Sequence, residues 1–179
     1  MPKPRLILLG PRGSGKTTLG RGLVRELRLP FVDTDAEIER AAGRTIAEIF
    51  ADEGEDGFRD RETDALRGCL ARDGILATGG GIVVREENRR LLQSIDAPRV
   101  LLLADVGLLA HRITNDPTST STRPSLTHHE VGDEVALLLE KRMPWYESVA
   151  THTVDTGLDV GHAQAQLHDI LSKRSRSEA

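Results

Sequence analysis

The sequence predicts an α/β protein with three α/β/α layers, in which helices cover both faces of a five-stranded parallel sheet. Short apolar runs alternate along the chain with longer amphipathic stretches, which is the pattern of repeated strand–helix units. The five candidate strands span residues 5–9, 30–32, 75–77, 100–103 and 151–154. Right-handed crossovers bring the carboxyl ends of such strands to one edge, where ligands bind. We therefore expect the functional residues to follow these strands.

Start signals for helices lie between the candidate strands. Glu48 follows Thr45 at the spacing of a capping box, and Thr127 and Glu130 repeat that spacing. With 179 residues and no internal repeat or linker, the chain should form a single domain, residues 1–179. We expect a disordered tail at about residues 172–179.

The composition excludes several classes of function. A formal net charge of −4 argues against a general nucleic-acid binder, whose affinity depends on a basic surface. Cys69 is the only cysteine, so we expect it to pack in the interior and to form no disulfide within the chain. No apolar run has the length of a signal peptide or of a membrane span, which needs roughly 20 residues. We expect a cytoplasmic protein, and a monomer because no long apolar or heptad pattern is present.

The most specific motif lies between the first candidate strand and the helical stretch after it. Residues 10–17 have the sequence GPRGSGKT, which fits the P-loop pattern G-x-x-x-x-G-K-[ST] at each fixed position. The glycines let backbone N–H groups converge on phosphate oxygens, and the following helix adds its positive end. Lys16 would reach the β- and γ-phosphates of a nucleotide, and the Thr17 hydroxyl would bind Mg²⁺. The motif predicts the P-loop NTPase fold; the alternative is a glycine-rich turn without a ligand.

A pair of carboxylates follows the second candidate strand. Asp33 and Asp35 are two residues apart, so both can face the same side at the end of the strand. One could hold a magnesium-bound water while the other accepts a hydrogen bond from a substrate hydroxyl. Alternatively, Thr34 or Asp35 could cap a helix that runs from Glu37. The neighbouring P-loop favours the chemical role.

Three glycines and two arginines indicate a second binding pocket. Gly79, Gly80 and Gly81 follow the third strand, where they weaken folding unless something approaches the backbone closely. Arg59, near the start of one helix, and Arg142, at the end of another, could both reach a substrate carboxylate, which a guanidinium fork matches well. Either arginine alone would be interpreted as a solvated surface residue. Together the five residues predict an acceptor pocket with a glycine floor.

Residues 114–127 are rich in small hydroxylated side chains and contain two prolines. Such a stretch buries little surface and predicts a mobile loop. It is either an exposed connection or a lid that closes over the nucleotide and delivers the charge of Arg123.

With these motifs in their order, the chain resembles the shikimate kinases, small P-loop kinases of the nucleoside-monophosphate-kinase-like group. The resemblance runs from the first strand to the last, and the joint order of the motifs is more diagnostic than any later motif alone. The motifs are the P-loop, the Asp33-Thr34-Asp35 pair, Gly57-Phe58-Arg59, Gly79-Gly80-Gly81, Arg123-Pro124 and Arg142-x-Pro144-x-Tyr146. The chain departs from the family in the lid, where Ser125-Leu126 replaces a leucine pair and a Thr/Ser run replaces a shorter, more basic segment.

The resemblance implies transfer of the γ-phosphoryl group of ATP to the 3-hydroxyl of shikimate, a step toward chorismate and the aromatic amino acids. Mg²⁺ is the implied cofactor, with Thr17 as its direct ligand and Asp33 acting through water. The implied ATP-binding residues are Gly13, Ser14, Gly15, Lys16, Thr17, Thr18, Arg112 and Arg123. Among these, Arg112 would stack on adenine, although an exposed role is an equal alternative for it.

The same resemblance implies how the acceptor binds and reacts. Asp35 would bind the ring hydroxyls and orient or deprotonate the attacking one. Arg59 and Arg142 would clamp the carboxylate, and residues 79–81 would complete the pocket. Lys16 and Arg123 would stabilise the charge that develops on the transferred group.

Two other functions remain open. A related kinase for gluconate or a nucleoside monophosphate would keep the same fold and P-loop, because fold does not fix substrate. A nucleotide-binding regulatory protein without turnover is the second alternative. The first is disfavoured by the two arginines and the glycines, and the second by the presence of every expected catalytic residue.

Overall fold

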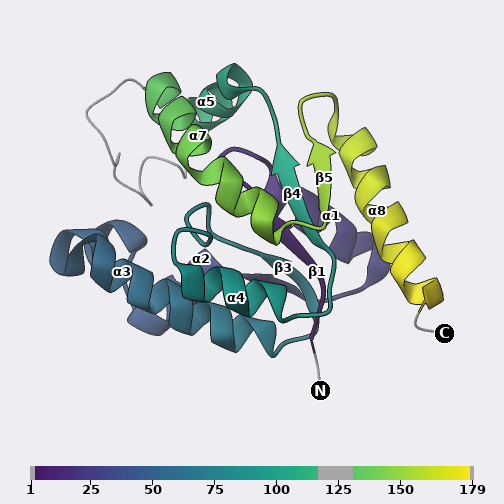
Figure 1. Cartoon of the computed structure of the whole chain (residues 1–179), viewed down its shortest axis with the longest axis horizontal. Helices are drawn as coiled ribbons and strands as arrows, with labels where there is room; N and C mark the ends of the chain where they lie inside the picture. The colour runs from purple at the N-terminus through teal and green to yellow at the C-terminus, as the bar shows by residue number, and fades with distance from the viewer. Residues whose placement is uncertain (1–2, 117–130, 178–179) are drawn as a thin grey trace.

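The chain folds around a parallel sheet whose strands are in the order β2-β3-β1-β4-β5. Figure 1 shows this arrangement in the computed structural model, which describes residues 3–116 and 131–177. The strands are β1 (Pro4–Leu9), β2 (Phe31–Asp33), β3 (Gly74–Ala77), β4 (Arg99–Leu103) and β5 (His152–Asp155). The predicted five-stranded parallel sheet is confirmed, and each strand begins and ends within one residue of its expected bounds.

Helices cover both faces of the sheet. They are α1 (Lys16–Leu27), α2 (Thr34–Ala42), α3 (Ile46–Leu70), α4 (Glu86–Gln93), α5 (Val106–Asn115), α7 (Val131–Val149) and α8 (Val160–Ser177). Figure 1 shows α4 and α7 in front of the sheet and α1 behind it.

The alternation of side chains along β1 explains the layers. Leu6 and Leu8 point to the face that α1 and α8 cover, whereas Ile7 and Leu9 point to the face that α3, α4 and α7 cover. All four side chains have no exposed surface. A strand buried on both faces has a continuous apolar sequence, which is how residues 6–9 appear.

Cys69 lies in the core formed by the second of these layers, as the sequence predicts. Its side chain is 2% exposed, and burial raises the pKa of the thiol to about 11. The thiol is therefore protonated at neutral pH and unreactive, because the thiolate is the nucleophile.

Helix α3 consists of two helical segments that meet at Gly54. This glycine has φ 68° and ψ −170°, a conformation that side chains with a Cβ rarely adopt. Phe50 and Phe58 stack across the bend with their ring centroids 4.5 Å apart. Arg61 also crosses it and donates to both carboxylate oxygens of Glu53, at 2.7 and 2.9 Å. The bend places Arg59 in the first turns of the second segment, near a helix start as predicted.

The structure confirms one predicted cap and corrects another. Thr45 and Glu48 form the capping box, with the Glu48 N–H donating to Thr45 Oγ1 and the Thr45 N–H donating to Glu48 Oε2. Helix α2, however, begins at Thr34, and Asp33 is its cap instead of Thr34 or Asp35. Asp33 ends β2 in an extended conformation, so its carboxylate can accept the Asp35 N–H at 3.0 Å. The other predicted box, Thr127 with Glu130, lies outside the described residues.

The predicted tail is wrong over residues 172–177, which continue α8. Leu171 anchors this end in the core, and an i,i+4 ion pair joins Lys173 to Asp169 at 2.6 Å. Arg174 donates to the backbone carbonyl of Asp96. These contacts order a stretch whose sequence gave no apolar signal beyond Leu171.

The first two residues of the segment predicted as a lid are helical. Residues 114 and 115 belong to α5, where Thr114 Oγ1 donates to the Ala110 carbonyl at 3.0 Å. The rest of the segment, from 117 to 127, lies outside the described residues.

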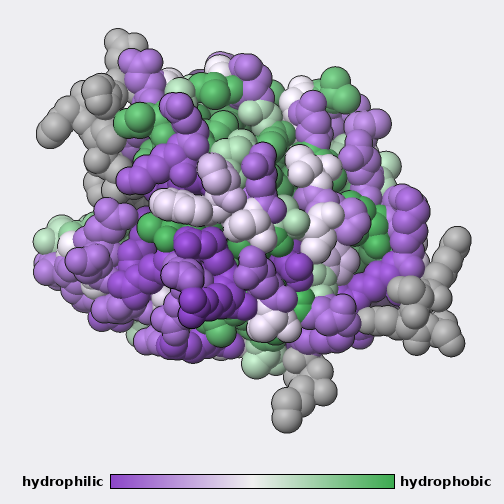
Figure 2. Space-filling model, viewed as in Figure 1, coloured by the Kyte–Doolittle hydropathy of each residue, from purple (hydrophilic) through white to green (hydrophobic). Residues whose placement is uncertain are grey.

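The surface over α3 and α4 is hydrophilic, as Figure 2 shows. Arg85 on this face pairs with Asp60 at 2.5 Å, and Arg67 pairs with Asp64 at 2.8 Å. Within residues 3–116 and 131–177, no helix combines the length and apolar character that crossing a membrane requires.

Candidate active site

The P-loop connects β1 to α1 at the carboxyl edge of the sheet. Gly10 has φ 139°, and a Cβ there would lie 2.4 Å from the Leu102 carbonyl oxygen, so only glycine fits. The Lys16 ammonium donates to the carbonyls of Gly10 and Pro11, each at 2.8 Å. The lysine thus lies across the loop, at the N-terminus of α1, where a phosphate would gain from the helix dipole.

A cavity of about 790 Å³ opens beside this loop. Its wall contains the predicted phosphate-binding residues Gly13, Ser14, Gly15, Lys16, Thr17 and Thr18, together with Asp33, Asp35 and Arg112. A cavity of this size is within the range of small-molecule sites.

Asp33 and Asp35 lie together in the wall of the cavity, at the end of β2. Thr17 Oγ1 donates to Asp33 Oδ2 at 3.1 Å, which links the P-loop to the carboxylate pair. Burial and the neighbouring charge of Asp35 raise the pKa of Asp33 and outweigh its hydrogen bonds, which lower it. The ionised form of the Asp33 carboxyl is therefore less favoured here than in water, and a cation bound beside it would offset that cost.

Arg112 lies on α5 at the wall of the cavity and is half-buried. It donates to the Thr156 carbonyl at 2.8 Å and to the Gly13 carbonyl at 3.3 Å. The arginine thereby joins the P-loop to the segment after β5. Stacking on adenine stays a prediction for this residue.

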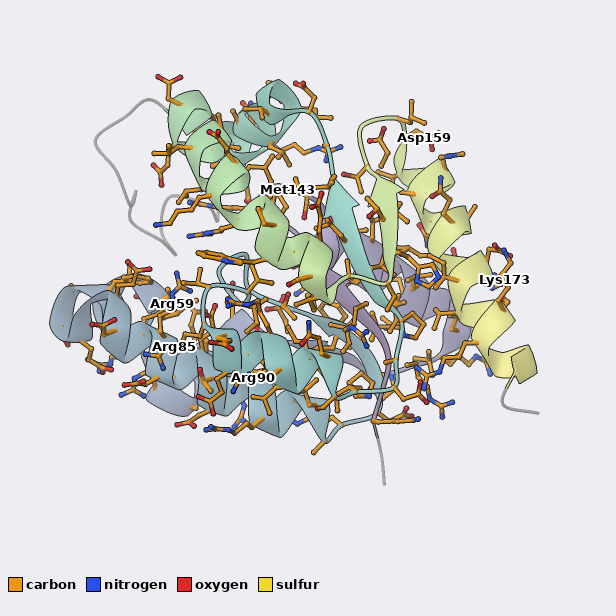
Figure 3. All side chains as sticks on the ribbon, in the orientation of Figure 1. Arg59, Arg85, Arg90, Met143, Asp159 and Lys173 are labelled. Atoms are coloured by element: carbon orange, nitrogen blue, oxygen red, sulfur yellow. The ribbon has the colours of Figure 1, made fainter. Side chains whose placement is uncertain are left out.

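A smaller cavity of about 70 Å³ adjoins the first, and the two arginines predicted to bind a carboxylate lie in its wall. Arg59 and Arg142 both line it, with Phe50, Phe58 and the apolar side chains of α7. Arg142 is not at the end of its helix as predicted, because α7 continues through Pro144 to Val149. Figure 3 shows Arg59 on the side of α3 that faces α7.

Arg59 is 4% exposed and is held by two carboxylates. Its guanidinium donates to Glu62 at 2.8 Å and to Glu55 at 3.1 Å, and Glu62 has no exposed surface. Burial by itself would lower the pKa of Arg59, but the two carboxylates outweigh it and raise the pKa. The arginine is permanently charged and fixed in the pocket wall.

The glycines follow β3, and Gly80 lies in the walls of both cavities. A Cβ on Gly81 would lie 2.2 Å from Arg59 Nη1, so the glycine is needed for the guanidinium to approach the backbone. The Gly79 N–H donates to Thr34 Oγ1 at 2.8 Å. The Gly80 carbonyl accepts from the Tyr146 hydroxyl at 2.5 Å and from Arg142 Nη1 at 3.2 Å.

Several wall residues were not assigned roles from the sequence. Arg12 lines both cavities, but it occupies a variable position of the P-loop pattern. Phe50 and Tyr146 line the smaller cavity, and Glu62 holds Arg59 in its wall. Phe50 and Tyr146 are aromatic, and the chain has only 3 Phe and 1 Tyr. This scarcity was the signal in the sequence that could have drawn attention to them. Arg123 lies outside the described residues.

The P-loop at the carboxyl edge of this five-stranded parallel sheet defines the class of the protein as a P-loop kinase fold. A family model described as shikimate kinase matches residues 12–172. The chain belongs to the shikimate kinase family, whose members are ATP-dependent transferases.

Curated relatives and solved structures agree with this assignment. The chain is 46% identical to the shikimate kinase of Nitratidesulfovibrio vulgaris over 151 residues, which is 84% of this chain and 85% of the relative. It is 44% identical to that of Rhodopirellula baltica over 156 residues, 86% and 83% of the two chains. The structure of shikimate kinase from Acinetobacter baumannii in complex with shikimate superposes with a TM-score of 0.85 and 39% identity, covering 97% of this chain and 95% of that one.

The fold extends to a kinase with a different acceptor. A gluconokinase from Sinorhizobium meliloti matches with a TM-score of 0.61 at 16% identity, covering 99% of this chain and 98% of the other. At that identity the match concerns the fold alone.

Proposed function

We propose that this kinase transfers the γ-phosphoryl group of ATP to the 3-hydroxyl of shikimate, giving shikimate 3-phosphate and ADP. The observation that supports this most is the meeting of the two cavities, which share Arg12 and Gly80 in their walls. A nucleotide on the P-loop would therefore direct its terminal phosphate toward a pocket built for a carboxylated molecule. The product would serve the route to chorismate and the aromatic amino acids.

The P-loop would hold the phosphates of ATP, and Lys16 would reach the β- and γ-phosphates. For this, its ammonium exchanges its bonds to the Gly10 and Pro11 carbonyls for bonds to phosphate oxygens. Phosphoryl transfer passes through a loose transition state with charge spread over the oxygens, so positioning and electrostatics dominate catalysis. Lys16 would stabilise this charge, and Arg123 is proposed as a second cation.

Thr17 and Asp33 are the residues that would hold Mg²⁺, directly and through water respectively. Both offer oxygen donors, and the raised pKa of Asp33 indicates charge that a divalent cation would neutralise. Mg²⁺ commonly binds through one or two carboxylates plus substrate phosphates. When bound, the ion would neutralise charge on the phosphate oxygens.

The acceptor would bind between Asp35 and the arginines. Asp35 would accept the proton of the attacking hydroxyl or orient it, and would contact the neighbouring ring hydroxyls. Arg59 and Arg142 would clamp the carboxylate, with Arg59 preorganised by its bond to the buried Glu62. Glycines 79–81 would let the ring approach the backbone.

The direct test is a coupled assay of ADP release with Mg-ATP and one acceptor at a time. Shikimate-dependent release is expected, with no release above background for gluconate, nucleoside monophosphates or no acceptor. Release with another acceptor alone would overturn the assignment of the pocket. Binding of ATP with no release for any acceptor would point to a regulatory protein.

We also propose that the protein is a cytoplasmic monomer. In the described part of the chain, the large exposed apolar side chains are few, namely Val131, Leu137, Leu158 and Val160. That is less than an obligate dimer interface requires. Size-exclusion chromatography with light scattering tests the monomer, and fractionation of the source cells tests the location.

A further inference from the structure

The glycine loop, residues 79–81, is attached to three helices that each carry a residue of the acceptor site. Thr34 of α2 binds the N–H of Gly79, and Tyr146 of α7 binds the carbonyl of Gly80. The guanidinium of Arg59, from α3, lies against Gly81. The loop therefore contacts side chains that come from distant parts of the sequence, and it can fix their positions relative to one another.

The Thr34 hydroxyl connects the loop to α2. Thr34 has no exposed surface, and its Oγ1 accepts the Gly79 N–H at 2.8 Å. It is the first residue of α2, and Asp35 is the next. The β2–β3 register adds a second link, because Asp33 pairs with Ala77. The Thr34 bond therefore sets the position of the Asp35 carboxylate relative to the loop.

The Tyr146 hydroxyl connects the loop to α7. Tyr146 also has no exposed surface, and its hydroxyl donates to the Gly80 carbonyl at 2.5 Å. Arg142 lies one helical turn earlier on α7 and donates to the same oxygen at 3.2 Å. A carbonyl oxygen has two lone pairs and can accept both bonds. Tyr146 therefore fixes the oxygen against which Arg142 is placed.

We propose that Thr34 and Tyr146 are positioning residues, whose hydroxyls hold the glycine loop between α2 and α7 so that Asp35 and Arg142 meet opposite ends of one acceptor molecule. The inference rests on the proposed function, which assigns Asp35 to the ring hydroxyls and Arg142 to the carboxylate. Neither hydroxyl is required to touch the substrate.

Two substitutions remove the hydroxyls with little change of shape. Thr34→Val leaves the buried Gly79 N–H without its acceptor, and Tyr146→Phe leaves the Gly80 carbonyl to Arg142. Each should raise the KM for shikimate about five- to tenfold, the range that loss of one buried hydrogen bond gives. The KM for Mg-ATP should stay within about twofold, because the P-loop is unchanged. Thr34→Ser keeps the hydroxyl and should restore the wild-type KM.

Thr63→Val is the matched control. Thr63 is 3% exposed, and its hydroxyl donates to a backbone carbonyl, that of Arg59, at 3.0 Å. The substitution removes a buried hydroxyl of the same kind, but one bonded within α3. It should lower the melting temperature and leave the KM for shikimate within about twofold.

A ligand comparison separates the two roles. Binding of shikimate and of its neutral carboxamide is measured by calorimetry for the wild type and both variants. Tyr146→Phe should weaken shikimate and leave the carboxamide nearly unaffected, because the variant acts through the arginine that binds the carboxylate. Thr34→Val should weaken both ligands by a similar factor, because it acts through the carboxylate that binds the ring hydroxyls.

The inference is overturned if both variants keep the wild-type KM for shikimate, or if the KM for Mg-ATP rises in parallel. A Thr34→Ser variant as impaired as Thr34→Val would also overturn it. If Thr34→Val does not fold, Tyr146→Phe with the two ligands decides the matter alone. Wild-type protein without shikimate-dependent ADP release would overturn the proposed function and this inference together, whereas normal wild-type turnover with unaffected variants would overturn only the inference.

Discussion

The Asp33 carboxylate accepts hydrogen bonds from two different elements. Its carboxylate caps α2 by accepting the Asp35 N–H, and it accepts the Thr17 hydroxyl from the P-loop. Burial and the charge of Asp35 nevertheless raise its pKa. The ionised carboxylate is thus less favourable here than in water, and we propose that a bound cation offsets this cost.

Asp33→Asn should raise the melting temperature of the ligand-free protein at pH 7, by about 2–4 °C if the gain is near 1 kcal/mol. Asparagine also caps helices, so the start of α2 is kept. A raised pKa means that folding favours the protonated carboxyl over the ionised one. The protonated carboxyl therefore adds to the free energy of unfolding below the unfolded pKa, and this contribution is lost as the pH rises through the folded pKa. The gain should therefore shrink on acidification toward pH 4. Thermal unfolding between pH 4 and 8 without Mg²⁺ checks this, and an unchanged or lower melting temperature at pH 7 would contradict it.

Asp35→Asn should lower kcat by about 10²-fold or more, because the amide cannot accept the proton of the attacking hydroxyl. The Kd for Mg-ATP should be nearly unchanged. Asp64→Asn makes the same change at an exposed position of α3 and should leave both quantities unaltered. Steady-state kinetics and calorimetry give the two values, and normal turnover of Asp35→Asn would remove this residue from the mechanism.

The bend in α3 shapes the wall of the smaller cavity from a distance, because Gly54 itself does not line it. The helix changes direction at Gly54, and Phe50 and Phe58 stack across the change. On its other side, Arg61 binds Glu53, which also pairs with Arg44. The second segment therefore presents Phe58 and Arg59 to the acceptor pocket at a fixed angle.

Gly54→Ala should destabilise the protein by about 1–2 kcal/mol, because alanine at positive φ is strained. It should also raise the KM for shikimate through the position of Arg59. Gly68→Ala is the control in the same helix: no atom lies within 4 Å of the added Cβ, and the substitution should stabilise by about 0.5–1 kcal/mol. Denaturant unfolding measures both, and effects of the same sign for the two variants would contradict the argument.

At the scale of the whole molecule, the site exists because parallel strands end at one edge. The P-loop follows β1, the aspartates follow β2 and the glycines follow β3, and these three strands are adjacent. The Thr78 hydroxyl also donates to the Leu8 carbonyl at 3.0 Å, which fixes the glycine segment beside the P-loop strand. The nucleotide and acceptor pockets are consequently parts of one surface.

Ligands should stabilise the whole fold, because they bind only this assembled edge. Mg-ADP at about 100 times its Kd should raise the free energy of unfolding by about 2.7 kcal/mol. Removal of Mg²⁺ with a chelator should abolish most of this gain in the free energy of unfolding for the wild type. For Asp33→Asn it should abolish only a small part of the gain. Thermal shift assays with and without the ion test this; an equal loss in both proteins would argue against Asp33 as part of the magnesium site.

Much of the fold was predictable because its signals are local. The strands appeared as continuous apolar runs, and the Thr45–Glu48 box marked the start of α3. The end of α8 was missed because Arg174 is held by a backbone carbonyl from the segment before β4. The cap of α2 was misassigned because Asp33, Thr34 and Asp35 are all good capping residues, and only the end of β2 decides among them.

The parallel sheet, the P-loop and the family were predictable from the sequence alone, because they depend on consecutive residues and on the order of motifs along the chain. Three-dimensional packing was needed to show that Tyr146 and Arg142 meet at the carbonyl of Gly80. Such contacts join segments that are distant in sequence, and they form only when helices pack against the same edge of the sheet. No local pattern encodes that packing, so the support of the acceptor pocket became visible only in three dimensions.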